Sequence, residues 1–234
     1  MTGLILKLIA MVTMLVDHLG YVFFPEYLWL RYVGRLAFPI YCFLIVEGFL
    51  HTRDLKAYMW RLFAFALISE IPFDMAFYGK VFDIEHQNVF FTMLFGLMAI
   101  ALMSLVNLEN KILEIILRLL IAVPFAATAQ LIHTDYRWVG VSMISVMYLF
   151  HDIKGLMAVC VAFLMLPAFT NSIEYMGLPS LIFINLYNGR RGYEKGLAGK
   201  VIQWSFYILY PAHLLLFALI RDHFFEGIGE IGRM

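Results

Sequence analysis

The first apolar run of the chain, residues 4–24, contains two residues whose types and spacing could do chemistry, Lys7 and His18. An α-helix turns about 100° per residue, so residues eleven positions apart (18 − 7) lie within roughly 20° of each other, about 16 Å apart along the axis. A cation near one membrane surface and an imidazole deeper on the same face are suited to a buried reaction. The pattern is equally explained by a lysine that snorkels to the interface and a histidine that hydrogen-bonds a neighbouring helix.

More ionisable groups lie inside other apolar runs, where charge is costly and usually functional. Together with His18, the membrane-embedded groups are Asp17, Glu47, Glu70 and His213, from four separate runs. A simple anchor or scaffold does not need them, whereas a helical bundle with a polar interior does. We therefore predict that they face one shared interior.

Two further sets of polar residues allow two interpretations each. Asn88, Thr92 and Gly96 recur every four residues, which suits either helix packing or a substrate groove. Tyr207 and Tyr210 suit either the membrane interface or the same interior.

The composition places the chain in a membrane. Of its 234 residues, 63% are hydrophobic and 15% are charged, whereas soluble domains are about half apolar and a quarter charged. The formal net charge is zero, which gives no indication of nucleic-acid binding. The two cysteines, Cys42 and Cys160, lie in apolar runs and form no disulfide or metal pattern, and the histidines lack metal-ligand spacing, so we expect no metal.

The elements that must position these residues are membrane helices. We predict an all-α polytopic bundle of about nine transmembrane helices, forming a single domain over residues 1–226 with a short tail at 227–234. Two of the runs are short for a full span. The runs are residues 4–24, 35–51, 56–76, 88–107, 110–131, 137–151, 154–170, 178–188 and 200–222.

Basic residues predict the orientation. One cluster, Arg53, Lys56 and Arg61, follows the second run, and another precedes the ninth: Arg190, Arg191, Lys195 and Lys200. With nine spans both clusters lie on one side, and positively charged loops are typically cytoplasmic. We therefore expect a cytoplasmic N-terminus in a bacterial inner membrane, although Arg31, Arg35 and Arg137 go against this trend.

Several stretches resemble the TraX family of conjugal-transfer membrane proteins, from about residue 6 to residue 220. They are KLIAMVTMLVDHLGY, RYVGRLAFPIYCFLIVEGFLHTR, ISEIPFD, NVFFTMLFG, LYNGRRG and FYILYPAHLLL. The resemblance implies an enzyme that acetylates a pilin N-terminus. It also implies a relation to transmembrane acyltransferases, such as the acyltransferase-3 and heparan-glucosaminide acetyltransferase families, which use cytoplasmic acetyl-CoA.

The acyltransferase-3 family carries a basic residue, ten intervening residues and a histidine in its first helix, a spacing that Lys7 and His18 match. By this resemblance, His18 is the catalytic histidine, acting as general base or as covalent acetyl carrier. Asp17 points about 100° away from His18 and suits a cation on another helix, such as Arg35. Glu47, Glu70 or His213 could orient the imidazole.

The remaining expected roles concern the two substrates. Arginines bind phosphates with bidentate geometry, so we expect Arg53, Arg61, Arg190 and Arg191 to bind the phosphates of acetyl-CoA, assisted by Lys7. We also expect Arg35 among the residues that bind acetyl-CoA. Asn88 or Tyr210 could polarise the thioester carbonyl, with Thr92 in the substrate groove.

The sequence leaves the acceptor open between a pilin-like protein, a glycan and a lipid. Two other classes also remain. Intramembrane acidic residues and histidines mark proton-coupled transporters too, although no repeat relates the two halves of the chain. The third class is a non-catalytic component of a pilus or conjugation machine, which would tolerate substitution of Asp17, His18 and Glu47.

Overall fold

The protein is all-helical, as predicted. The computed structural model describes residues 1–167, 169, 173–193 and 196–231, and no β-strand occurs among these residues. The helices are α1 (Gly3–Phe23), α2 (Leu28–Gly34), α3 (Ala37–His51), α4 (Leu55–Tyr78), α5 (Val89–Met103), α6 (Lys111–Leu131), α7 (Arg137–Leu149), α8 (Lys154–Leu164), the 3₁₀ turn η1 (Glu174–Gly177), α9 (Ser180–Asn185) and α10 (Leu197–Ile231).

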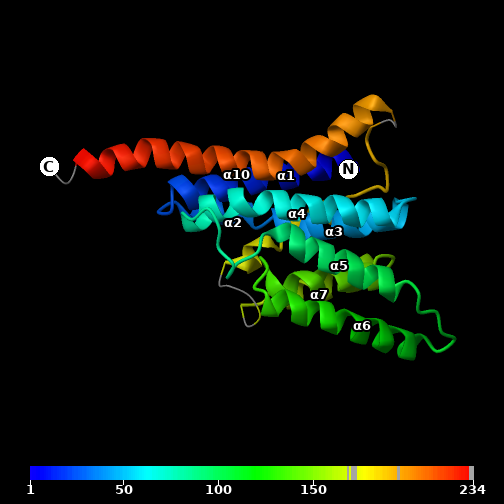
Figure 1. The fold of residues 1–234 in the computed structure, drawn as a ribbon. Helices are drawn as coiled ribbons and strands as arrows, with labels where there is room; N and C mark the ends of the chain where they lie inside the picture. Colours follow the sequence, from blue (N-terminus) through cyan, green and yellow to red (C-terminus); the bar gives the residue numbers. More distant parts are fainter. Residues whose placement is uncertain (168, 170–172, 194–195, 232–234) are drawn as a thin grey trace.

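The long helices run side by side, with α1 beginning at one end of the bundle and α10 ending at the other (Figure 1). Helix α10 packs along α4 and α1, while α5, α6 and α7 form the opposite side of the bundle. We call the end where α1 begins the Lys7 end and the opposite end the Asp135 end. The described residues of both basic clusters lie towards the Lys7 end, since α4 and α10 also begin there (Figure 1), and Lys195 lies outside the described residues.

Each predicted apolar run contains a helix, but the helices differ in length. Four stretches are long and apolar enough to cross a membrane: Gly3–Phe23, Leu28–His51, Lys111–Leu131 and Gly199–His223. Helices α5, α7 and α8 are apolar but shorter, and α9 has only 6 residues. The protein is therefore a multi-pass membrane protein, and the nine crossings stay a prediction. Helix α10 continues through residue 226 to Ile231, and residues 232–234 of the predicted tail lie outside the described residues.

Helix α2 is an element that we did not predict from the sequence. It is a 7-residue helix that packs against α1 so closely that two glycines are needed. A methyl group on Gly20 would come within 2.6 Å of Leu30, and one on Gly34 would overlap the side chain of Asp17. This close approach brings α2 and the residue that follows it, Arg35, onto the face of α1 that carries Asp17.

The start of α1 is held by the chain segment that follows α9. The first amides of a helix have no partner within the helix. Here the amide of Gly3 donates to the carbonyl of Arg190 (2.8 Å) and that of Leu4 donates to the carbonyl of Arg191 (2.9 Å). The amino terminus donates to the carbonyl of Leu186 (2.7 Å). These bonds bring Arg191 close to Lys7, although 184 positions (191 − 7) separate them in the sequence.

Candidate active site

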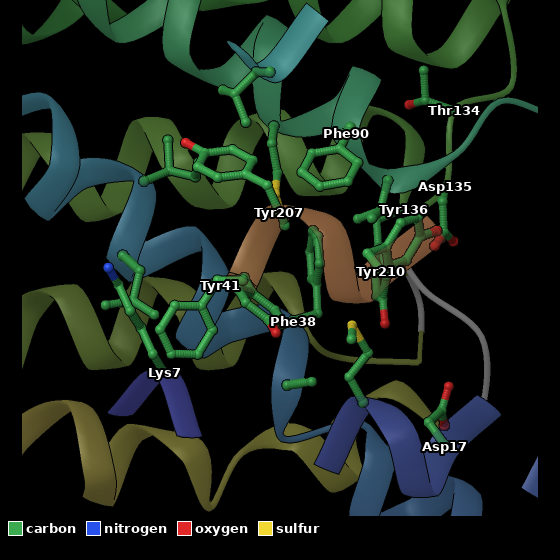
Figure 2. Close-up of a pocket in the computed structure, with 18 of the residues that line it drawn as sticks. Lys7, Asp17, Phe38, Tyr41, Phe90, Thr134, Asp135, Tyr136, Tyr207 and Tyr210 are labelled. Atoms are coloured by element: carbon green, nitrogen blue, oxygen red, sulfur yellow. The ribbon is translucent and has the colours of Figure 1, made fainter. Parts of the chain in front are cut away.

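A cavity of about 1130 Å³ runs through the bundle from the Lys7 end to the Asp135 end. Its volume is slightly above the range of about 300–1,000 Å³ that is usual for ligand pockets. Figure 2 shows Lys7 on one side of the cavity and Asp17, Asp135 and Tyr136 on the other, with aromatic rings between them. The predicted site residues that line it are Lys7, Asp17, His18, Arg35, Glu47, Arg61, Arg191 and Tyr210.

The Lys7 end of the cavity is cationic. Lys7, Arg61 and Arg191 line it, and none of the three forms an ion pair with a carboxylate among the described residues. The Lys7 ammonium instead lies 5.8 Å from the ring centre of Tyr193 and 5.4 Å from that of Phe206. Lys7 and Arg61 are partly buried, and Arg191 is exposed. Partly buried cations are normally paired with anions, so this end is suited to an anionic ligand.

A carboxylate also lies at this end but has its own partners. Glu47 accepts a hydrogen bond from the Tyr187 hydroxyl (2.8 Å), and its other oxygen is 2.6 Å from His151 Nε2. His151 lies in the turn after α7, and the hydrogen bond with Glu47 raises the pKa of His151. His51, one turn along α3, is 3.7 Å from the same carboxylate. Glu47 therefore joins α3 to two loops, and His18 is not among its partners.

The imidazoles of His18 and His213 are hydrogen-bonded in the interior. His18 Nδ1 lies 2.6 Å from His213 Nε2. Their ring planes are within 8° of parallel, and the centroids are 4.9 Å apart. The distance between the two ring centres equals the distance between the two bonded nitrogens plus the radius of each ring. The rings therefore lie edge to edge in nearly one plane rather than face to face. This is the geometry of a well-aligned hydrogen bond.

The partner of His213 determines which nitrogens carry protons. His213 Nδ1 lies 2.7 Å from the carbonyl oxygen of Leu209. A carbonyl can only accept, so His213 Nδ1 carries a proton, and in the neutral ring Nε2 is an acceptor. His18 Nδ1 must then donate to it, which leaves His18 Nε2 with a free lone pair. The network thus assigns to His18 the tautomer that a general base requires.

The surroundings of His18 are aromatic. Phe77 packs edge-on against its ring with centroids 5.1 Å apart, and Tyr210 does so at 6.0 Å. His213 is 5% exposed and does not itself line the cavity, whereas His18 does. His18 therefore presents its ring to the cavity while His213 supports it from behind.

An ion-pair cluster closes the Asp135 side of the site. Arg35 donates to Asp17 through Nη2 in a very short contact, and to Glu174 through Nη1 (2.7 Å). Arg31 lies 3.4 Å from the same Asp17 oxygen. The prediction that Asp17 pairs with Arg35 rather than with His18 is confirmed. Arg35, which we expected to bind acetyl-CoA, instead pairs with two carboxylates through its two terminal nitrogens.

Several predicted site residues lie outside the cavity lining. Glu70 accepts from the backbone amide of Asn88 (2.9 Å) and from its side-chain amide (2.5 Å). The same Asn88 amide donates to Ala66, and its oxygen caps α5 by accepting from Phe90. Thr92 is bonded to Thr134 (2.9 Å) and to the carbonyl of Asp135. These buried groups join helices and loops, so the structure gives Glu70, Asn88 and Thr92 packing partners and no access to a substrate in this cavity.

Two of the predicted phosphate-binding arginines are also outside the lining. Arg53 and Arg190 are exposed and do not line the cavity. Arg190 is adjacent in sequence to Arg191, which does line it. The basic cluster signal in the sequence located the correct loop but could not separate its two arginines.

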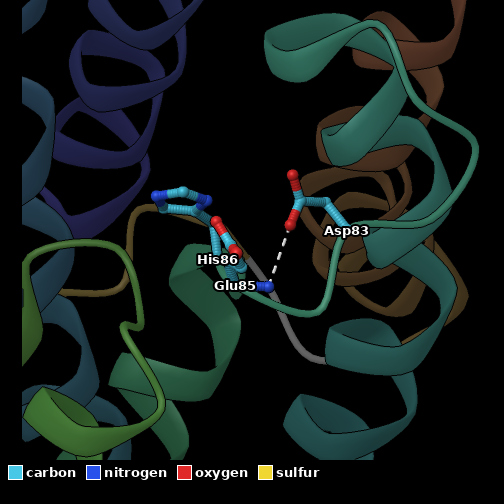
Figure 3. Close-up of side chains that lie close together, drawn as sticks. All are labelled: Asp83, Glu85 and His86. Atoms are coloured by element: carbon cyan, nitrogen blue, oxygen red, sulfur yellow. Dashed lines mark hydrogen bonds between the residues drawn. The ribbon is translucent and has the colours of Figure 1, made fainter.

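The structure also brings Asp83, Glu85 and His86 together in the loop before α5 (Figure 3), with potential ligand atoms within 4.8 Å of one another. The Asp83 carboxylate already accepts from Lys80 (3.0 Å) and from the backbone amide of Glu85 (2.9 Å). These two donors already occupy both oxygens of the one buried carboxylate in the group. The expectation that the protein binds no metal stays a prediction.

Sequence reasoning missed several residues that shape the site, because they carry no spacing signal and most of them lie outside the long helices. Four of them line the cavity, Arg31, Asp135, Tyr136 and Tyr187, and a fifth, His151, contacts Glu47. Tyr136 has a positive φ of 61°, and its ring stacks on Phe38 with centroids 3.4 Å apart. No spacing rule in the sequence connects these loops to the first helix.

The fold and the cavity define a multi-pass helical membrane protein with an internal polar site open to ligands. The chain belongs to the TraX family, whose model, described as TraX protein, matches residues 2–221. It is 28% identical over 239 residues to a protein of Dichelobacter nodosus named "Probable fimbrial assembly protein FimC, serogroup H1", covering 90% of this chain and 92% of that protein. A short stretch of 39 residues is 41% identical to an uncharacterized protein of Rickettsia prowazekii, covering 17% and 16% of the two chains. No solved structure matches the chain.

Proposed function

We propose that this protein is an integral membrane acetyltransferase that moves acetyl from cytoplasmic acetyl-CoA to an acceptor amine or hydroxyl at or across the membrane. The observation that carries the proposal is the hydrogen-bonded His18–His213 pair, which leaves a basic nitrogen in a cavity with a cationic end. General bases of this kind are needed when an N–H or O–H group attacks an acyl carbon.

The charges of the Lys7 end support acetyl-CoA as the donor. Its phosphates are anionic, and the three cations Lys7, Arg61 and Arg191 have no carboxylate partner among the described residues. Arginine donates to phosphate in bidentate fashion. Lys7 and His18 are on one face of α1 about 16 Å apart. An extended pantetheine arm could cover that distance, with the phosphates at the Lys7 end and the thioester beside His18.

The reaction then follows from the free lone pair of His18. The acceptor nitrogen or oxygen attacks the thioester carbonyl carbon while His18 Nε2 takes its proton, and His213 stabilises the resulting imidazolium through the bond at Nδ1. The tetrahedral intermediate collapses as its C–S bond breaks, and the CoA thiolate leaves and takes the proton from His18. Tyr210, whose ring lies edge-on to His18, supports a donor role towards the carbonyl oxygen. In the alternative route the same lone pair attacks the thioester carbon and the C–S bond breaks to release the CoA thiolate. The acceptor then attacks the resulting acetyl-imidazole, which frees His18, and the acceptor proton passes to the thiolate.

The membrane orientation and the acceptor follow by the same proposal. The N-terminus is cytoplasmic in a bacterial inner membrane, which places the Lys7 end where acetyl-CoA is found. The name of the Dichelobacter nodosus relative, a fimbrial assembly protein, supports a pilin-like protein as acceptor. The alternative acceptors are a glycan and a lipid, because the sequence does not distinguish them from a protein.

The proposal is tested by reconstituting the protein in lipid nanodiscs and following release of the CoA thiol from acetyl-CoA with membrane extract as the acceptor source. The wild-type protein is expected to turn over, and His18→Ala is expected to lose about 10²–10⁴-fold in rate. Full activity of a folded His18→Ala variant would refute the mechanism. A proton-coupled transporter would instead show substrate flux into liposomes in the absence of CoA, and a non-catalytic pilus component would show neither activity.

A further inference from the structure

The loop between α6 and α7 lines the Asp135 end of the cavity and has an unusual backbone. His133, Tyr136 and Arg137 have positive φ values of 52°, 61° and 46°, and they are the non-glycine residues with positive φ in the described part of the chain. Such conformations cost of order 1–3 kcal/mol each and persist only where the surroundings impose them.

The surroundings do impose this backbone. The Asp135 amide donates to the carbonyl of Gln87 (2.8 Å), and its carbonyl accepts from the Thr92 hydroxyl. The Gln87 amide donates in turn to the carbonyl of His133 (3.2 Å), and the Tyr136 ring stacks on Phe38. The main chain of Asp135 is therefore held on both sides by neighbouring elements.

The Asp135 side chain, in contrast, has no partner. Its carboxylate faces the cavity and forms no hydrogen bond or ion pair with the described residues (Figure 2). Arg35 lines the same end of the cavity and is engaged by Asp17 and Glu174. Arg137 also lines this end but forms no ion pair with Asp135. The Asp135 residue is exposed to the cavity, and desolvation by the surrounding protein raises its pKa to about 6 against the opposing effect of Arg35.

A second acceptor atom at this end is also unused. Gln130, on the last turn of α6, lines the cavity, and its Oε1 is buried without a hydrogen-bond partner. A buried acceptor without a donor is costly, and a ligand that supplies the donor removes the cost. Anions are excluded beside Asp135 by charge, so this end is suited to a neutral or cationic group that carries several N–H or O–H bonds.

We propose that Asp135, assisted by Gln130, binds the N–H- or O–H-bearing head of the acceptor and holds it towards His18. This inference rests on the proposed acetyltransferase function, and it divides the cavity into a cationic donor half and an acceptor half with hydrogen-bond acceptors. Asp135, Tyr210 and His18 line the same cavity, and the Tyr210 ring is 6.0 Å from that of His18, so the acceptor half adjoins the reacting centre.

The test uses the full chain in nanodiscs with two acceptor probes, glycylglycinamide as an ammonium and methyl β-D-glucoside as a set of hydroxyls. Probe binding is measured as the shift in Tm at up to about 100 mM, far above the millimolar Kd of a weak ligand. Acetyl-CoA binding is measured by calorimetry on the same samples. The variants are Asp135→Asn and the control Glu85→Gln, which removes an exposed carboxylate from the neighbouring loop and does not line the cavity.

We expect at least one probe to stabilise the wild-type protein and Asp135→Asn to weaken its binding by about tenfold or more, as for a hydrogen bond to a charged group. Glu85→Gln should bind the probe normally, and both variants should bind acetyl-CoA like the wild type. A larger loss for glycylglycinamide than for the glucoside would identify an amine head, and the reverse a hydroxyl head.

The inference is overturned if neither probe stabilises the wild-type protein, or if Asp135→Asn binds the probes as the wild type does. An Asp135→Asn variant that also loses acetyl-CoA binding would overturn it too, since the donor half would then depend on this residue. Absence of acetyl-CoA binding in the wild-type protein is a separate outcome, because it contradicts the proposed function while probe binding still decides the role of Asp135.

Discussion

At the scale of single residues, the tautomer of His18 is the feature on which the chemistry depends. The sequence offered three possible partners for its imidazole, Glu47, Glu70 and His213. The structure places His213 there, with its own Nδ1 committed to the Leu209 carbonyl. A neutral partner that accepts from Nδ1 keeps Nε2 free without adding a second charge to the interior.

This arrangement predicts a graded response at His213. His213→Ala removes the acceptor for His18 Nδ1 and is expected to lower kcat by about tenfold to a hundredfold, the equivalent of a hydrogen bond worth about 1.5–3 kcal/mol. His213→Gln, whose amide oxygen can accept, should recover part of the loss. The measurement is kcat and KM for acetyl-CoA, with KM expected to stay near the wild-type value.

Equal activity of His213→Ala and the wild type would show that the pair is only a packing contact. If kcat falls equally in His213→Ala and His213→Gln while both variants keep normal thermal stability, the hydrogen bond accepted from His18 is not the cause of the lower kcat.

At the scale of elements, the segment after α9 positions the cationic end of the cavity. It carries Arg191, its carbonyls accept hydrogen bonds from the first amides of α1, and it is bonded to α3 through Tyr187 and Glu47. Glu47 therefore acts on this loop rather than on His18, which differs from the role we expected for it.

Tyr187→Phe tests this connection. Removing the hydroxyl frees the loop from α3 while Glu47 keeps His151, so we expect KM for acetyl-CoA to rise by about tenfold and kcat to change by less than about twofold. Tyr175→Phe, an exposed tyrosine in η1 outside the cavity lining, is the matched control. A fall in kcat of Tyr187→Phe at unchanged KM would contradict this role and would indicate that Glu47 takes part in the chemical step.

The elements that carry apolar runs could be predicted from the sequence, and the loops could not. The run containing Lys7 and His18 gave helix α1 and its reactive face because helical spacing is regular. Pro39 lies in the first turn of α3, where proline is tolerated. Asn88 and Thr92 were misplaced because a helix face with small polar residues looks the same whether it meets a ligand or a neighbouring helix. Asp135 and Tyr187 lie in loops whose positions depend on long-range contacts.

At the scale of the whole molecule, the cavity connects the two ends of the bundle and its charge differs along its length. The three cations that line the Lys7 end have no ion pair among the described residues, whereas at the Asp135 end Arg31 and Arg35 are paired with Asp17 and Glu174. This polarity suits an anionic donor that enters from one side and an acceptor that approaches from the other.

The orientation is testable by cysteine labelling. In a background with Cys42→Ala and Cys160→Ser, single cysteines at Thr52 and Gln87 sample the cavity lining at the two ends. We expect a membrane-impermeant maleimide to label Gln87→Cys in intact spheroplasts and Thr52→Cys only after permeabilisation. The reverse pattern would place the N-terminus outside, and labelling of both from one side would contradict a membrane-spanning cavity.

The most direct test of the account is acetyl-CoA binding to the purified protein by calorimetry, comparing Arg191→Ala with Arg190→Ala and His18→Ala. The two arginines are neighbours in one loop, but only Arg191 lines the cavity. The account predicts saturable binding that is about tenfold weaker in Arg191→Ala, unchanged in Arg190→Ala and retained in His18→Ala. No binding of acetyl-CoA to the folded wild-type protein at millimolar concentration would contradict the account, and loss in Arg190→Ala equal to that in Arg191→Ala would contradict the proposed binding site.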